Sequence, residues 1–157
     1  LLVKMKKGVD IAQVSRVTKA FSDNNIMVHA YLMYGFPTET EQETIDSLEI
    51  VRQLFETNCI QSAFWHQFTT TAHSPIGKNP DEFEIKIIGP KFKGFAENDL
   101  FHEDPTGADH VKFSKGLNLA LHNYLNGAGF DVPLKDWFEF NTKTTELPKN
   151  LIASFLE

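Results

Sequence analysis

The sequence predicts an α/β fold, and three observations lead to that prediction. A nearly continuous apolar segment at residues 26–34 is rich in β-branched and aromatic side chains. Such a segment is typical of a strand buried on both faces. The charged segments on either side carry apolar residues at three- and four-residue spacing, which is typical of amphipathic helices. A second strand-like segment follows at residues 60–69, and helix–strand–helix–strand order with short connections indicates consecutive βα units.

The composition is that of an ordinary globular protein. Of 157 residues, 41% are hydrophobic and 23% are charged. The net charge of −6 leaves too few clustered cations for general nucleic-acid binding, so no nucleic-acid partner is expected. No apolar run approaches the roughly 20 residues of a membrane span. Cys59 is the single cysteine, which favours a reducing, cytoplasmic location, and we expect it to be a small buried residue.

The first helix is predicted to begin after Asp10. Gln13 lies three residues further on, which completes the spacing of a capping box. Turn-forming residues at 23–25 are expected to end the helix. Its apolar stripe consists of Ile11, Val14, Val17 and Phe21.

A turn is predicted directly after the strand at 26–34. Gly35 tolerates positive φ, and Pro37 cannot donate a hydrogen bond to a β-ladder. Two overlapping Ser/Thr-x-x-Glu patterns follow, beginning at Thr38 and Thr40, and either can cap the next helix. That helix is expected at residues 41–56.

The strand at 60–69 contains two polar neighbours, His66 and Gln67, whose side chains must point to opposite faces. Residues 69–76 are expected to form the loop that leaves this strand.

Beyond Pro75, glycine and proline interrupt the chain every few residues. Two short strands are expected, at residues 83–88 and 95–101, followed by a turn at 104–107. The pairing of these strands is left open. Helices are predicted at 109–126, with Gly127 as its left-handed C-cap, and then at 133–138 and 148–155.

Two segments resemble a known family. Residues 35–40, Gly-Phe-Pro-Thr-Glu-Thr, resemble the Gly-Phe-Pro-Gly-Glu-Thr segment of radical S-adenosylmethionine (SAM) enzymes. The most similar branch often carries a cobalamin-binding domain. Residues 1–10 are similar to the Leu-x-x-Met-x-Lys-Gly-Val-Thr segment of the same family. Thr38 stands where the family usually has glycine, so the turn can differ in shape. The family's Cys-x-x-x-Cys-x-x-Cys cluster motif is absent.

The resemblance implies a partial (β/α) TIM-like barrel. Residues 1–76 would form its C-terminal half, with the strands at 26–34 and 60–69 as the fifth and sixth. Residues 77–157 would form a mixed α+β extension that shapes substrate access. One side chain of the His66–Gln67 pair would face the barrel interior or its mouth. The residues implied to contact SAM are Tyr34, Gly35, Phe36, Pro37, Glu39 and His66.

The resemblance also implies a chemistry that this chain cannot perform alone. In the family, a [4Fe-4S] cluster reduces SAM and yields a 5′-deoxyadenosyl radical. The cluster ligands are missing here, so we expect the 157 residues to be a C-terminal piece of a longer iron–sulfur oxidoreductase or transferase. The missing N-terminal part of the same polypeptide is then its first partner. The piece alone is expected to be inactive, with no catalytic residue and no metal ligand assigned. Cobalamin is a candidate cofactor of the whole protein.

Other interpretations stay open. The histidines show no His-Glu-x-x-His spacing, and neither a nucleophile elbow nor a phosphate-binding glycine loop is present. The alternatives are a non-enzymatic α/β module that binds a ligand or a protein, and an α/β enzyme of another class. Exposed strand edges would allow the fragment to form a homo-oligomer. The substrate and the type of reaction are not indicated.

Overall fold

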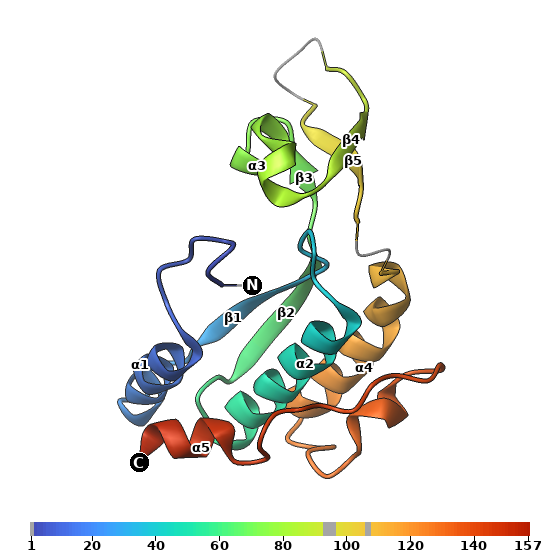
Figure 1. Cartoon of the computed structure of the whole chain (residues 1–157). Helices are drawn as coiled ribbons and strands as arrows, with labels where there is room; N and C mark the ends of the chain where they lie inside the picture. The colour runs from blue at the N-terminus through green and yellow to red at the C-terminus, as the bar shows by residue number, and fades with distance from the viewer. Residues whose placement is uncertain (1, 93–96, 106–107) are drawn as a thin grey trace.

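The computed structural model describes residues 2–92, 97–105 and 108–157 and has a mixed α/β fold. Its centre is a parallel pair of strands, β1 (His29–Tyr34) and β2 (Ser62–Gln67), connected by helix α2 (Glu41–Glu56) (Figure 1). Helix α4 (Ser114–Leu125) packs beside α2 against the same strand pair. The predicted α/β class is therefore confirmed. Within the described part of the chain the strands do not close into a barrel.

Further helices lie beside this unit. Helix α1 (Ile11–Asp23) precedes β1, and the C-terminal helix α5 (Leu151–Leu156) lies against α1 and α2. Two single-turn 3₁₀ segments, η2 (His110–Phe113) and η3 (Leu134–Trp137), flank α4. Among the described helices, none has the length and apolar character that crossing a membrane requires.

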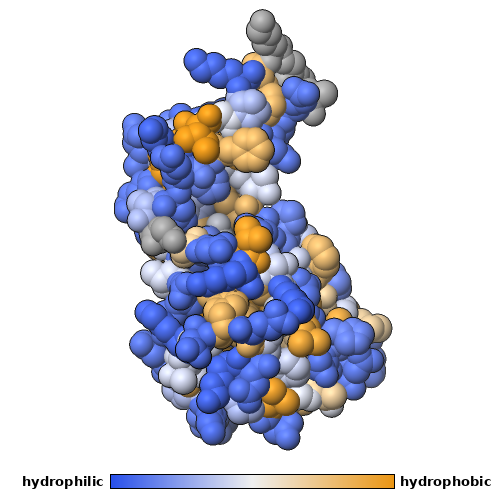
Figure 2. Space-filling model, turned by 90° about the vertical axis from the view of Figure 1, so that its right-hand side faces the viewer, coloured by the Kyte–Doolittle hydropathy of each residue, from blue (hydrophilic) through white to orange (hydrophobic). Residues whose placement is uncertain are grey.

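A second sheet projects from the carboxyl ends of β1 and β2 (Figure 1). It is called the smaller sheet here because its strands are shorter than β1 and β2. Its antiparallel strand order is β3 (Thr70–Thr71), β5 (Asp99–Glu103), β4 (Lys86–Gly89). Helix α3 (Pro75–Lys78) and the 3₁₀ turn η1 (Pro80–Phe83) fill the connection between β3 and β4. On the side viewed in Figure 2, hydrophilic residues predominate and hydrophobic ones form small separate groups, so no extended apolar surface lies there.

The main core lies between the strand pair and the helices. Ala63 and Trp65 of β2 meet the fully buried Ile45 and Leu48 of α2, and Leu117 of α4 joins them. This core therefore includes residues on both sides of position 76. The boundary between a 1–76 unit and a 77–157 extension stays a prediction.

The opposite face of the strand pair is open, which corrects the expectation that the strand at 26–34 is buried on both faces. Tyr31 is 62% exposed and Phe64 is 52% exposed. Alternation sends every second side chain away from α2 and α4, and within the described residues nothing covers the middle of that face.

Several boundaries also differ from the expectations. Asn25 has φ +60, so the chain is still turning there and β1 begins only at His29. The predicted loop at 69–76 contains β3 and the start of α3. The strand expected at 83–88 is displaced to Lys86–Gly89, because Phe83 closes η1 and Glu84 has φ +57.

The strand expected at 95–101 lies partly outside the described residues, as does the turn at 104–107; the observed β5 runs from Asp99 to Glu103. The three predicted C-terminal helices are present at shifted bounds, and Gly127 has the left-handed φ of +68 expected of a C-cap. Asp10 accepts a hydrogen bond from the Gln13 amide at 2.7 Å, which confirms the first cap.

Candidate functional site

The turn at the end of β1 is closed by hydrogen bonds on both sides. Gly35 has φ +77, a left-handed conformation that only glycine adopts without strain. The Phe36 amide donates to Oε2 of Glu39 at 3.0 Å, and the Glu39 amide donates to the Phe36 carbonyl at 2.8 Å. The chain therefore leaves the strand through a compact loop that its own acidic side chain holds.

Glu39 is 1% exposed. Its second oxygen, Oε1, accepts a hydrogen bond from Oγ1 of Thr44 at 2.9 Å. Burial raises the pKa of the carboxyl group above its ordinary value. The hydrogen bonds from Phe36 and Thr44 and the nearby His110 act in the opposite direction. Both oxygens serve the turn, so Glu39 can act at a ligand only by holding the backbone.

Thr40, rather than Thr38, caps helix α2. Oγ1 of Thr40 accepts from the Glu43 amide at 3.2 Å, and Oε2 of Glu43 accepts from the Thr40 amide at 2.8 Å. Thr38 has φ +71 instead. Of the two candidate caps, the one at Thr38 is therefore excluded, because a residue in a left-handed conformation cannot adopt the extended backbone of an N-cap.

The aromatic side chains of the turn are used for packing. Tyr34 lies on the core face, where its ring meets Trp65 edge-on at 6.1 Å. Phe36 faces the smaller sheet and packs edge-on against Phe68 at 5.1 Å. Pro37 is also fully buried. What this turn can offer a ligand is thus mainly backbone carbonyl groups, because the amides of Phe36, Thr38 and Glu39 already donate within the protein.

His66 lies away from these residues, on the open face of the strand pair. Its ring centroid is 5.6 Å from that of Tyr31, and Tyr31 is 6.2 Å from Phe64. His66 and Tyr34 therefore point to opposite faces. Gln67, by contrast, contacts the turn: its Cγ lies 3.5 Å from where a Cβ on Gly35 would be. The structure brings together the predicted residues 34–39 but leaves His66 on a separate surface.

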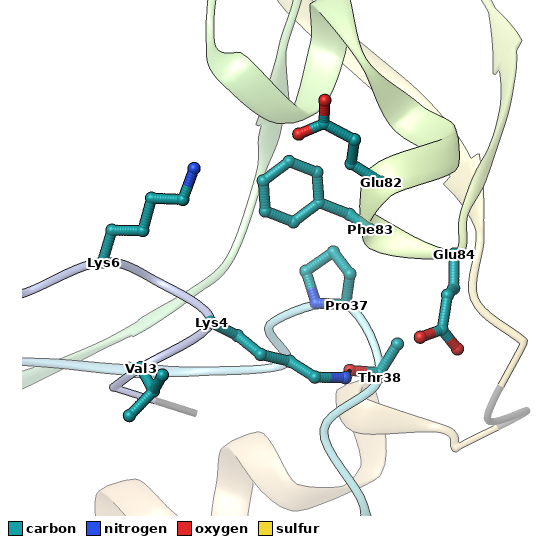
Figure 3. A pocket seen from close by; sticks show the side chains of 8 residues that line it. All are labelled: Val3, Lys4, Lys6, Pro37, Thr38, Glu82, Phe83 and Glu84. Atoms are coloured by element: carbon teal, nitrogen blue, oxygen red, sulfur yellow. Dashed lines mark hydrogen bonds between the residues drawn. The ribbon is translucent and has the colours of Figure 1, made fainter.

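A cavity of about 160 Å³ lies against the turn (Figure 3). It combines residues of the two segments that carry the family resemblance. From the N-terminal segment, Nζ of Lys4 donates to Oγ1 of Thr38 at 2.6 Å. The ring of Phe83 lies over Pro37 (Figure 3). The lining residues are Val3, Lys4, Lys6, Pro37, Thr38, Glu82, Phe83 and Glu84. Two cations and two carboxylates around an apolar floor suit a small polar or zwitterionic group.

Two residues near the turn, His110 and Asp104, were not indicated as site residues by any sequence pattern. His110 is 8% exposed, and its Cβ and Cγ lie 3.3 Å from the position of a Cβ on Gly35. Oδ2 of Asp104 accepts a hydrogen bond from the Thr38 amide at 3.3 Å and lies 3.7 Å from Nε2 of His110. Sequence separations of 66 residues or more hide such contacts from pattern analysis.

His102, on β5, lies close to this group. Its Nδ1 is 3.0 Å from Oγ1 of Thr70, and its ring meets Phe68 edge-on. Burial lowers the pKa of His102. The charge of Asp104 opposes this shift, and that of His110 adds to it.

Metal ligands do not gather within the described residues: no group of three His, Cys, Asp or Glu side chains is arranged to hold an ion.

Cys59 is 0% exposed, with Sγ 3.7 Å from the Ser15 carbonyl, which confirms the expected small buried residue.

Comparisons with known proteins add no relative: no family model, no curated protein and no solved structure matches the chain.

Proposed function

We propose that these residues form the C-terminal part of the catalytic domain of a radical SAM enzyme. In this proposal β1 and β2 belong to a partial (β/α) barrel, and the turn at residues 35–39 lies beside the adenosine of SAM. The parent protein would be an iron–sulfur oxidoreductase or transferase. This chain would supply one wall of the cofactor site and a cap over the substrate entrance.

One observation carries the proposal: the backbone of Thr38. Radical SAM enzymes usually have glycine at this position, and here the residue adopts φ +71. A β-branched residue at positive φ is a true outlier, and residues held in such conformations cluster at functional sites. The conformation is one that glycine would adopt freely, so the departure in sequence is compatible with the family's backbone shape. Lys4 and Asp104 hold the strained residue through its hydroxyl and its amide.

The position of the turn gives further support. Ligands of open α/β sheets and of barrels bind at the carboxyl ends of parallel strands, which is where residues 35–39 lie. The N-terminal segment and the turn share one cavity. At about 160 Å³ it is smaller than the roughly 300 Å³ at which ligand pockets begin, so the rest of a SAM site must come from elsewhere.

The two implied cofactors fit this chain differently. The turn can present backbone carbonyl groups to the amino group of adenine. His66, Tyr31 and Phe64 lie on the face that a barrel would enclose. A [4Fe-4S] cluster does not fit, because the single cysteine is buried in the core. In a whole protein, a cluster held by cysteines outside these residues would supply the electron that cleaves SAM.

A second candidate function is a binding module without catalysis. The open aromatic face favours it, because exposed Tyr31 and Phe64 beside His66 could contact a partner directly. A barrel fragment and a binding module make different predictions for cofactor content.

The decisive experiment compares the complete reading frame with the 157 residues alone. Both are expressed anaerobically, reconstituted, and assayed for iron and acid-labile sulfide. We expect about four irons per chain in the complete protein and none in the fragment. Absence of iron from both after reconstitution would overturn the radical SAM proposal and leave the binding module.

The same complete protein tests the role of the turn. Gly35→Ala should weaken SAM binding in equilibrium dialysis, because φ +77 and the 3.3 Å approach of His110 oppose a Cβ. Gly127→Ala is the matched control. It has a similar φ of +68, and a Cβ there meets nothing within 4 Å. Equal SAM affinity in both variants would exclude residues 35–39 from the site.

A further inference from the structure

His110 is buried at the point where the C-terminal segment meets the turn. It opens η2, directly before α4, and is 8% exposed. Among the described residues, neither Nδ1 nor Nε2 has a hydrogen-bond partner. The side chain lies against Gly35, where the chain leaves β1, because its Cβ and Cγ are 3.3 Å from the position that a Cβ on Gly35 would occupy. A neutral ring in this position leaves two buried polar atoms unsatisfied.

Acidic groups face this ring from two other elements. Oδ2 of Asp104, on the segment after β5, is 3.7 Å from Nε2. The carboxylate of Glu39, on the turn, interacts electrostatically with His110. On β5, His102 also faces it and opposes a second positive charge. Gln67, at the end of β2, is a neutral neighbour of the same turn. Among the described residues, the titratable groups found around His110 are therefore two carboxylates and one histidine.

Protonation of the His110 ring changes how strongly it interacts with Asp104 and Glu39. The imidazolium has two N–H donors and a positive charge, and it can form charge-assisted contacts with carboxylates. Asp104 already accepts the Thr38 amide, and Glu39 already accepts the Phe36 amide. A charged His110 would thus attract both acids that hold the turn, whereas a neutral His110 contributes packing alone.

We propose that His110 is a positioning residue that latches the C-terminal segment onto the turn at residues 35–39, and that protonation of its ring tightens this latch. The inference uses contacts within the chain and stands whether or not the turn binds SAM. Protonation of His110 would therefore order the turn and join it more firmly to α4.

The test is an NMR pH titration of the 157-residue chain. Ring ¹⁵N shifts report the protonation of His110, and the amide shifts of Gly35 and Thr38 report the turn. We expect the amides to follow the midpoint of the His110 ring. We also expect the Phe36 amide to exchange at least about threefold more slowly below that midpoint, after correction for the intrinsic rate.

Three variants separate charge from packing. His110→Phe keeps a buried ring without a titrating group, and it should remove the shared midpoint from the Gly35 and Thr38 amides. His122→Gln is the matched control: His122 is an exposed histidine of α4, and its loss should leave the midpoint unchanged. His102→Gln should also leave it in place, which distinguishes the buried His110 from the partly buried His102.

Asp104→Asn keeps the His110 ring and removes a facing charge, so it tests the latch even if His110→Phe fails to fold. It should reduce the pH-dependent slowing of Phe36 exchange. The proposal is overturned if the turn amides keep the wild-type pH profile in folded His110→Phe, or if their midpoint disappears in His102→Gln. It is also overturned if Asp104→Asn leaves the slowing of Phe36 exchange unchanged.

Discussion

Replacing Glu39 by alanine should destabilise the protein strongly. The substitution removes two acceptors, Oε2 for the Phe36 amide at 3.0 Å and Oε1 for the Thr44 hydroxyl at 2.9 Å. Thr44 has a second acceptor in the Thr40 carbonyl at 3.3 Å. The Phe36 amide has no other acceptor among the described residues, and Phe36 is only 4% exposed. One orphaned buried donor and one lost charged hydrogen bond together cost about 2–4 kcal/mol, after the relief of a buried charge is included.

Glu39→Gln is the matched comparison. The amide oxygen of glutamine can still accept from Phe36, and the side-chain volume is kept, so we expect a loss of about 1 kcal/mol or less. Urea unfolding at pH 7, followed by circular dichroism and linear extrapolation, measures both values. An alanine variant within about 0.5 kcal/mol of wild type would refute the view that Glu39 holds the turn. A glutamine variant as weak as alanine would show that the charge, rather than the hydrogen-bond geometry, matters.

The same pair gives a pH dependence with a definite sign. Because the pKa of Glu39 is raised in the folded state, the folded protein holds this proton more tightly than the unfolded chain. The resulting stability is fully present below the ordinary value of 4.5 and is lost as pH rises through the folded value. Wild-type stability minus that of Glu39→Gln should therefore decrease as pH rises from about 4.5. A difference that increases with pH would contradict the burial argument.

Three further predictions concern neighbouring positions. Thr40→Ala should cost about 1 kcal/mol in urea unfolding, because it removes a capping box. Thr38→Gly should be neutral or stabilising by up to about 1 kcal/mol, since glycine relieves the φ of +71 at the expense of the Lys4 contact; a clear loss would show that the contact outweighs the strain. Because the pKa of His102 is lowered, wild-type stability minus that of His102→Gln should decrease as pH falls below 6.5.

Local patterns predicted the unit around β1 and α2 well. The capping pattern at Thr40, the apolar stripe of α2 and the glycine at the strand end each act over a few residues, so sequence spacing determines them. The two candidate caps could not be separated, because the choice depends on the backbone of Thr38. Long-range contacts from Lys4 and Asp104 hold that backbone.

The cover of each strand face could not be predicted. An apolar run such as residues 26–34 indicates that burial is favourable on both sides, but it does not say what covers each side. Here α2 and α4 cover the face that bears Tyr34, and Tyr31 on the other face is 62% exposed. In the smaller sheet, apolar and polar residues alternate along the strand expected at 83–88. Glu84 has a left-handed backbone, so the observed strand begins only at Lys86. Periodicity did not indicate that φ value, because glutamate rarely adopts it.

The arrangement of the turn also changes which chemistry its motif can perform. Phe36 is buried against the smaller sheet, and Pro37 is also buried. Both carboxylate oxygens of Glu39 already accept hydrogen bonds, from the Phe36 amide and the Thr44 hydroxyl. Side chains that pack inward cannot recognise a ligand, but they fix the backbone that can. A motif of this kind needs residue types for their conformation and packing rather than for their reactivity. Substitution should therefore be tolerated where the φ value is kept, as Thr38 already suggests, and should be damaging where a Cβ meets His110, as at Gly35.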